Sequence, residues 1–492
     1  MNYHENCKEW FSLEFDIRIN EVFVNGHLQS YILVESILAG NKKYFKTVQG
    51  DVSADTIWRF DDECGIWRED GVPYIEKIIE ESLSTKIKAR YFYEILKIFK
   101  VETYVKHEDF EDDPGSIALQ NGEYDLVTDT LIHWNPNHNH KNRLPVRYDP
   151  EADCPAFKKF LKEILPEDQN SIQELFGYLL VSGYPIQRAF IFHGAGANGK
   201  STLILVIEAF LGKENVSTIT LFDLVTQRFS KAELFGKRAN IAPDIGAEEL
   251  KKTGLFKTLT GRDTITAERK NQHPFQFVNY AKLIFSCNQL PTSPDNSDAF
   301  FRRFQIYTFT KVFNEKDPAT IDQKTLLQTI ANPQELSGIL NWALCGYHRL
   351  IENGMKLSES RGTETIKELY LEMADPINAF LKTETEEDSE AETLKNEFYR
   401  AYRDFCILKG HIALEDNRFF RTLNGRVSFQ DSQKTVNGTR VRFLKGIRLL
   451  HARDTQDAQV PSFGGVKLDQ FSSDKITRAS YATRESASSI VQ

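Results

Sequence analysis

The residues Gly194-Ala-Gly-Ala-Asn-Gly-Lys-Ser-Thr202 are the most informative segment of this chain, because they fit the pattern Gly-x-x-x-x-Gly-Lys-Ser/Thr. Glycines let such a loop turn its backbone N–H groups inward around a polyphosphate, the lysine reaches the β- and γ-phosphates, and the hydroxyl ligates Mg²⁺. Residues 189–193 before the loop have an apolar strand pattern, and residues 203–211 after it predict a helix whose positive end faces the phosphates. The sequence therefore predicts an α/β fold built on a P-loop NTPase core.

Every residue of this loop is a candidate for holding the nucleotide, which is expected to be ATP with Mg²⁺. The cofactor-binding candidates are Gly194, Ala195, Gly196, Ala197, Asn198, Gly199, Lys200, Ser201 and Thr202. Lys200 is also the first catalytic candidate, because its charge meets the reacting phosphates, and Ser201 is a predicted metal ligand.

Two polar residues at strand ends supply further catalytic candidates. A hydrolase needs a carboxylate that holds Mg²⁺ and the attacking water, and Asp244 ends the strand predicted at residues 239–244. Asn288 ends the apolar strand predicted at residues 281–288, where its amide can orient the water or sense the γ-phosphate. Taken singly, Asp244 has the alternative of a turn acid and Asn288 that of a capping residue.

Two groups of cationic residues follow the acidic strand. Residues 264–267 and 275–278 predict a hairpin with a charged tip. The DNA-binding candidates at this tip are Arg269, Lys270 and His273. Farther along, Arg302 and Arg303 can stabilise transition-state charge as an arginine finger does, although each on its own has the alternative of an ordinary surface charge.

The C-terminal part has the pattern of a winged helix. Residues 394–408 and 417–423 predict two helices, and residues 436–443 predict a strand pair that turns at an Asn-Gly dipeptide. Between residues 418 and 448, eight Lys or Arg stand against one Asp, a local charge of +7 in a chain of net charge −9. This predicts a local DNA-binding surface, with a merely solvated basic domain as the alternative. Its DNA-binding candidates are Arg440, Arg442 and Lys445.

Composition limits the class of protein. A chain of 492 residues has room for about three domains. It has no apolar run of about eighteen residues, and its first residues lack a basic segment followed by an apolar one. Neither a membrane span nor a secretory signal is therefore expected, and the predicted location is cytoplasmic. The six cysteines show no Cys-x-x-Cys spacing, which disfavours a zinc ribbon or a disulfide framework.

A histidine triplet in the segment before the motor raises the question of a metal site. His133, His138 and His140 offer imidazole ligands, but no cysteine or acidic residue stands near them in this loop. Their Asn, Pro and Lys neighbours favour a solvated turn, and the sequence therefore predicts no metal ion there.

The order of these motifs resembles the superfamily 3 helicases of viruses, phages and plasmids. Within this superfamily, the motif sequences are most similar to those of the poxvirus-type and the phage or plasmid primase-helicases. The segments that carry this likeness are residues 236–238, 259–263, 266–270, 285–288 and 299–303. Residues 121–157 resemble the domain before the motor in that family, and residues 338–344 resemble its helical lid. The resemblance covers roughly residues 60 to 450, and the combination of motifs is specific.

The resemblance implies an ATP-dependent, ring-forming DNA helicase, usually a hexamer, that serves the replication of a virus, phage, plasmid or integrated mobile element. Its partners would be single-stranded and duplex DNA, with a polymerase or primase as a further partner. It would work in the cytoplasm of a bacterial or archaeal host, or at a viral replication site. The resemblance also implies residue roles. Lys200 and Ser201 would bind the phosphates and Mg²⁺, Asp244 would be the acidic catalytic residue and second metal ligand, and Asn288 would sense the γ-phosphate. Arg303, with Arg302 as second choice, would be the finger that reaches a neighbouring subunit's ATP, and Arg269 and Lys270 would lie on a pore hairpin.

Two departures and two alternative functions stay open. Asn240 and Pro243 interrupt the strand before the acid, so Glu248 or Glu249 is an alternative catalytic base. Primase activity is not supported, because nucleotidyl transfer needs a pair of metal-binding acids and the N-terminal segment offers only Asp16. The alternatives to a helicase are an ATP-switch replication initiator or loader that binds origin DNA without processive unwinding, and a DNA-binding scaffold with a vestigial ATPase.

The sequence thus predicts six parts along the chain. They are an N-terminal α+β region of unknown role (1–110), a mostly helical domain before the motor (111–180), a superfamily 3, AAA+-like ATPase with a helical lid (181–380), an acidic linker (381–393), a winged-helix module (394–450) and a disordered tail (451–492).

Overall fold

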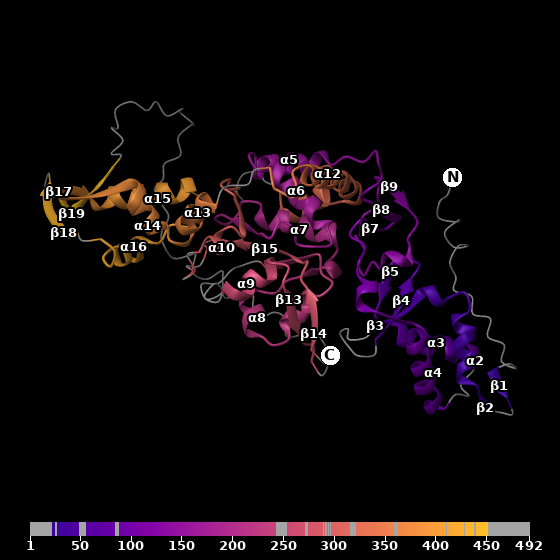
Figure 1. Cartoon of the computed structure of the whole chain (residues 1–492). Coiled ribbons are helices and arrows are strands. Elements are labelled where there is room, and N and C mark those ends of the chain that lie inside the picture. Colours follow the sequence, from indigo (N-terminus) through magenta and orange to yellow (C-terminus); the bar gives the residue numbers. More distant parts are fainter. Residues whose placement is uncertain are drawn as a thin grey trace, which may run out of the picture.

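Three parts follow one another along the chain. The computed structural model describes residues 22–24, 27–48, 56–83, 88–242, 253–270, 274–288, 290, 293, 295, 297–314, 321–358, 363–409, 411–427, 429–436 and 439–450. The N-terminal part (22–110) and the C-terminal module (376–449) lie on opposite sides of the central part (116–374) in Figure 1. No helix among the described residues combines the length and the apolar character that a membrane crossing requires.

The N-terminal part is an α+β unit around one hydrophobic core. Its elements are β1 (Phe23–Val24), β2 (His27–Leu28), α2 (Ser30–Leu38), η1 (Lys42–Tyr44), β3 (Phe45–Val48), β4 (Ile57–Asp61), β5 (Ile66–Arg68), α3 (Gly71–Leu83), α4 (Ala89–Glu102), β6 (Tyr104–Val105) and η2 (His107–Phe110). The four-stranded sheet has the order β5-β4-β3-β6. The run Tyr31–Val34 has the composition of a strand but lies inside α2, because Leu33, Val34 and Ile37 are buried at helical spacing.

The segment before the P-loop mixes strands with helices. A three-stranded sheet of order β7-β8-β9 precedes two helices. Its elements are β7 (Ser116–Leu119), β8 (Gly122–Asp125), β9 (Thr130–Ile132), η3 (Pro136–His138), α5 (Pro155–Ile164) and α6 (Gln169–Leu179). The expectation of a mostly helical domain over 111–180 is therefore wrong, because the first half of this segment pairs as an antiparallel sheet.

A five-stranded parallel sheet carries the P-loop. Its strands are β10 (Ala189–His193), β11 (Val216–Ser217), β12 (Ala239–Ala242), β15 (Lys282–Cys287) and β16 (Phe304–Thr308), in the order β11-β12-β15-β10-β16. Phe190 and Phe192 belong to one hydrophobic cluster, whereas Ala189 and Ile191 belong to another. The sheet is thus buried on both faces, which explains why its strands are continuous apolar runs.

Helices and one hairpin complete the central part. The helices are α7 (Lys200–Leu211), η4 (Lys213–Asn215), α8 (Leu221–Thr226), η5 (Ser230–Leu234), α9 (Thr253–Thr260), α10 (Asp298–Phe301), α11 (Gln323–Ile330), α12 (Pro333–Glu352) and α13 (Thr363–Ala374). The predicted hairpin is confirmed as β13 (Thr264–Ala267) and β14 (Phe275–Val278). Helix α12 lies close to α6, because Gly346 has no side chain and a Cβ there would stand 2.2 Å from the Gln173 carbonyl oxygen.

The C-terminal module contains three helices and a three-stranded sheet. Its elements are α14 (Pro376–Glu384), β17 (Thr385–Leu394), α15 (Lys395–Lys409), α16 (Asp416–Leu423), β18 (Gln430–Val436) and β19 (Thr439–Leu449), with the sheet order β17-β19-β18. The expected acidic linker at 381–393 is wrong, because most of it is β17. Acidic side chains of this strand form ion pairs with basic side chains of the other two strands: Glu386 with Arg448 of the adjacent β19, and Glu392 with Lys434 of β18, on the far side of β19. The expected tail, 451–492, lies outside the described residues.

Candidate functional site

The P-loop connects β10 to α7 with a backbone that only small residues permit. Gly199 precedes the first turn of α7 with φ of +88°, in the left-handed region that favours glycine. A Cβ at Gly194 would stand 2.4 Å from the Phe309 carbonyl oxygen and 2.5 Å from Nδ2 of Asn198. The glycines therefore form the narrow concave turn that a polyphosphate cradle needs, at the positive end of α7.

Lys200 joins the loop to a distant strand end. Its side chain is buried, and its Nζ donates to the carbonyl oxygens of Gly194 and, at 3.1 Å, of Ala195. It also donates to Oδ1 of Asn198 at 3.2 Å and to Oδ1 of Asn288 at 3.3 Å. The structure thus brings together two catalytic candidates that are 88 residues apart in sequence.

Asn288 lies at the carboxyl edge of the sheet, beside the P-loop. β15 lies between β10 and β12, so Asn288, which follows β15, faces the start of the P-loop. The acidic candidates Asp244, Glu248 and Glu249 lie outside the described residues; β12, which precedes them, ends at this same edge.

The first turn of helix α7 contains two hydroxyl residues that differ in solvent exposure. Ser201 is exposed, and Thr202 is buried and accepts a hydrogen bond at 3.2 Å from Nε2 of Gln323 in α11. The glycine cradle, the buried lysine and the exposed Ser201 hydroxyl fit a nucleotide polyphosphate with Mg²⁺.

His193 is a site residue that the sequence analysis did not single out. It ends β10 immediately before the P-loop, and its side chain is fully buried. Burial, and then the charges of His411 and Lys200, lower the pKa of His193 to about 3. Its ring is therefore neutral near pH 7 and adds no positive charge beside Lys200.

The neighbour of His193 comes from the C-terminal module. The ring of His411, in the segment between α15 and α16, lies 5.3 Å from the ring of His193 between centroids. Lys409 forms an ion pair of 3.2 Å with Glu372 of α13 in the central part. The module therefore packs directly on the central part, next to the P-loop.

The paired arginines lie at the opposite edge of the sheet from the P-loop. Arg303 comes just before β16, and its carbonyl oxygen accepts a hydrogen bond of 2.7 Å from the backbone N–H of Ala189, the first residue of β10. Its Nε donates at 3.0 Å to Thr260 of α9. The five residues of β10 separate Arg303 from the P-loop by about 17 Å. Arg302 is exposed beside it. Neither arginine is placed to reach the phosphate site of its own chain.

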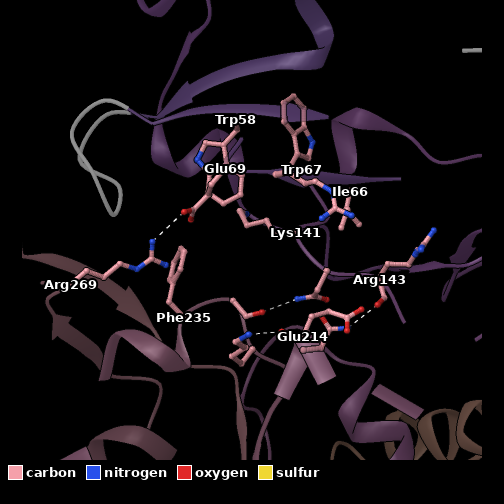
Figure 2. Close-up of a pocket in the computed structure, with 14 residues that line it drawn as sticks. Trp58, Ile66, Trp67, Glu69, Lys141, Arg143, Glu214, Phe235 and Arg269 are labelled. Atoms are coloured by element: carbon pink, nitrogen blue, oxygen red, sulfur yellow. Dashed lines mark hydrogen bonds and ion pairs between the residues drawn. The ribbon is translucent and has the colours of Figure 1, made fainter. Parts of the chain in front are cut away.

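The hairpin tip faces the N-terminal part. Nη1 of Arg269 lies 3.2 Å from Oε2 of Glu69, and both side chains are about one-third exposed. Figure 2 shows this contact at the rim of a cavity of about 450 Å³ between the N-terminal and central parts. Lys270 is exposed, and His273 lies outside the described residues.

Ion pairs with acidic residues offset part of the positive charge of the C-terminal module. Three of its cations are paired with acids: Arg426 with Asp375, Lys434 with Glu392, and Arg448 with Glu386. Lys445 stands opposite Glu392 in the β17–β19 register. Arg440 and Arg442 lie beyond the end of β17, are exposed, and have no ion pair within the described residues.

The fold and the loop define a protein of the P-loop class. Comparison with protein families gives two matches: "D5 N terminal like" over residues 41–166, and "Family of unknown function (DUF5906)" over residues 192–303. The second match begins in β10 and ends at Arg303, so it contains the P-loop, Asn288 and the paired arginines.

Known proteins similar to the chain include viral ones. A protein of Acanthamoeba polyphaga mimivirus named a putative helicase is 30% identical over 223 residues, which are 42% of this chain and 23% of that protein. One of Invertebrate iridescent virus 6 with the same kind of name is 26% identical over 369 residues, 67% of this chain and 36% of that protein. The chain therefore spans about a quarter to a third of these relatives. Among solved structures, the match to the apo NrS-1 C terminal region covers 85% of this chain and 100% of the NrS-1 chain, with 13% sequence identity and a TM-score of 0.43.

The resemblance seen in the motifs is confirmed by the family match and by these relatives. The chain is thus similar to viral proteins named putative helicases, and these matches support its resemblance to the superfamily 3 helicases of the viral and phage type.

Proposed function

We propose that this chain is the motor subunit of an ATP-dependent DNA helicase that serves the replication of a virus, a phage or a related mobile element. The contact of 3.3 Å between Lys200 and Asn288 is the observation that carries the proposal. It places a phosphate-binding cation and a polar amide at one sheet edge, as hydrolysis of a γ-phosphate requires. The relatives' names as putative helicases support a nucleic acid as the substrate.

ATP would bind at the P-loop with its phosphates against Lys200. Mg²⁺, held by Ser201 and Asp244, would neutralise phosphate charge when bound. The hydrogen bond from Gln323 to Thr202 supports a helical lid near α11, because it joins α11 directly to the start of α7.

The position of the arginines supports a ring. Arg303 lies about 17 Å from the P-loop of its own chain, so a finger role requires the P-loop of a neighbouring subunit. A closed ring gives every subunit such a neighbour, and the family resemblance indicates six of them.

DNA would pass the hairpin of β13 and β14. The cavity beside the hairpin is lined by more basic than acidic side chains: Arg68, Lys141, Arg143, Lys237 and Arg269 against Glu69 and Glu214. A positively charged groove of this kind binds the phosphate backbone of nucleic acid without sequence preference.

The double variant Arg269→Ala and Lys270→Ala is expected to keep basal ATPase activity and to lose unwinding. The hairpin tip is separate from the P-loop, so hydrolysis continues, while the cationic grip on phosphate is removed. Strand displacement on a forked duplex, measured beside ATP turnover without DNA, checks this.

Glu69→Ala is the matched control for the hairpin variant. It breaks the same ion pair with Arg269 but leaves both hairpin cations. Loss of unwinding in the control as well would assign the defect to the interdomain ion pair instead of to DNA grip.

The C-terminal module would act as a winged helix with Arg440 and Arg442 on its wing. Replacing both arginines with alanine is expected to weaken duplex binding and to flatten its salt dependence by about 0.9 units of log–log slope for each phosphate that the wing no longer neutralises. Lys434→Ala is the matched control, because Lys434 is already paired with Glu392. Binding titrations over a salt series decide the matter; equal slopes in wild type and the double variant would contradict the role of the wing.

Measurement of DNA-stimulated ATP turnover together with strand displacement tests the proposal as a whole. A second candidate, an ATP-switch initiator or loader, is favoured by one observation: the packing of His411 against His193 joins the C-terminal module to the P-loop strand. ATP turnover that responds to duplex DNA without any strand displacement would favour this second function.

A further inference from the structure

The loop at residues 133–140 is not the solvated turn that its composition predicts. His140 is 1% exposed and His138 has a side chain 28% exposed, whereas His133 is exposed and stands apart. An acidic residue that is distant in sequence joins the two inner histidines. This is Glu123 of β8, whose side chain is completely buried.

Two imidazole rings converge on one carboxylate oxygen. Oε1 of Glu123 contacts Nδ1 of His138 and lies 3.1 Å from Nε2 of His140. One nitrogen or oxygen atom from each residue lies within 4.8 Å of the other two. The second oxygen, Oε2, accepts a hydrogen bond of 3.2 Å from the backbone N–H of Asn135, which fixes the carboxylate with Oε1 toward the rings.

A second acid lies beside the same pair of histidines. Oδ2 of Asp113 lies 3.8 Å from Nδ1 of His138. Two acidic side chains thus face two imidazoles, and buried acidic groups in proteins are paired with other groups or coordinate metals.

We propose that Glu123, His138 and His140 form a binding site for one Zn²⁺ ion, with Asp113 or a water molecule at the fourth position. Two imidazole nitrogens and a carboxylate oxygen are a ligand set that zinc prefers, and Mg²⁺ and Ca²⁺ prefer oxygen ligands alone. Ligands of one tetrahedral zinc ion stand about 3.3 Å apart, close to the separation of Glu123 and His140. The contact of His138 with Glu123 is closer and widens when the ion enters.

Polar groups already surround the proposed ligands as a second layer. The Asn135 side-chain amide lies 3.2 Å from Nε2 of His138, the ring nitrogen of His138 that does not contact Glu123. The Asn135 backbone N–H holds the Glu123 carboxylate. Such contacts fix ligand orientation in metal sites.

The position of the site assigns the ion a structural role at a junction. The carbonyl oxygen of His140 accepts a hydrogen bond of 2.7 Å from the backbone N–H of Trp67 in β5, and that of Pro136 accepts one of 3.0 Å from the Trp67 indole. The loop of residues 133–140 therefore joins the N-terminal sheet to the β7–β9 sheet. A zinc ion that ties this loop to Glu123 would fix the N-terminal part against the central part.

The test uses the full chain, purified without a histidine tag, and measures bound zinc by elemental analysis. One zinc ion per chain is expected, with a thermal midpoint that falls after chelation and recovers when zinc is added back. His138→Asn and Glu123→Gln are expected to lower zinc affinity by more than about tenfold. His133→Gln, which removes an exposed histidine of the same loop, is the matched control and is expected to bind zinc as the wild type does.

Cobalt keeps the proposal testable if a variant fails to fold. Co²⁺ added to the metal-free wild type is expected to give the intense visible bands of tetrahedral coordination by nitrogen and oxygen, without the charge-transfer band of thiolate ligands. A wild-type chain that binds neither zinc nor cobalt would overturn the proposal. So would a thiolate band, or a loss of zinc in His133→Gln as large as that in His138→Asn.

Discussion

Replacing Lys200 with alanine is expected to lower ATP turnover by on the order of 100-fold or more while the chain stays folded. Lys200 is the one lysine of the P-loop, and its Nζ lies 3.1 to 3.3 Å from loop and Asn288 oxygens that surround the expected place of the phosphates. Alanine removes the charge that would meet the β- and γ-phosphates, and no other side chain of the loop replaces it. Steady-state phosphate release at saturating ATP measures the loss.

A matched control separates this effect from a general loss of positive charge. Lys213→Ala removes an exposed lysine just beyond the end of α7, on the far side of this helix from the P-loop, and is expected to hydrolyse ATP at the wild-type rate. Far-ultraviolet circular dichroism and the thermal midpoint of both variants establish that they are folded. Turnover near the wild-type rate in Lys200→Ala would remove the P-loop from the mechanism.

Replacing Arg303 with alanine is expected to leave ATP binding intact and to lower hydrolysis by about a thousandfold. The residue is too far from the P-loop of its own chain to act there, so the expected loss comes from the neighbouring subunit's site. Arg303 also donates to Thr260 within its own chain, so a thermal midpoint must accompany the rate. Arg302→Ala serves as the comparison, because Arg302 is its exposed neighbour and the second candidate for the finger.

Mixing experiments distinguish a finger that acts across subunits from one that acts within its chain. A mixed ring contains interfaces where an intact P-loop from an Arg303→Ala subunit meets an intact finger from a Lys200→Ala subunit. Partial recovery of ATP turnover is therefore expected on mixing the two inactive variants. Absence of recovery at every ratio, with mixed rings demonstrated by native mass spectrometry, would contradict the role of Arg303 in trans.

Short apolar runs with clear boundaries could be predicted from the sequence. The strand predicted at 189–193 is β10, the strand predicted at 281–288 contains β15, and both arms of the hairpin are present. Most apolar residues of these elements are buried by the fold, so the hydrophobic pattern of each element predicts its secondary structure. The errors fall where that link fails. The acidic run expected to be a linker, for example, is mostly strand β17, whose acidic side chains form ion pairs with basic residues of β18 and β19.

The phosphate loop, the order of motifs around it and the family resemblance could be predicted from the sequence alone, because each depends on contiguous residues. Which distant groups meet depends on the tertiary structure. The parallel sheet places Asn288 beside Lys200 and Arg303 at the opposite edge. The pairing of β17 with β19 places acidic residues beside basic residues of the C-terminal module. Strand β8 places Glu123 beside His138 and His140. The physical reason is the same in each case: charge and hydrogen-bonding capacity are local properties of residues, whereas the distance that turns them into a site depends on strand order and packing.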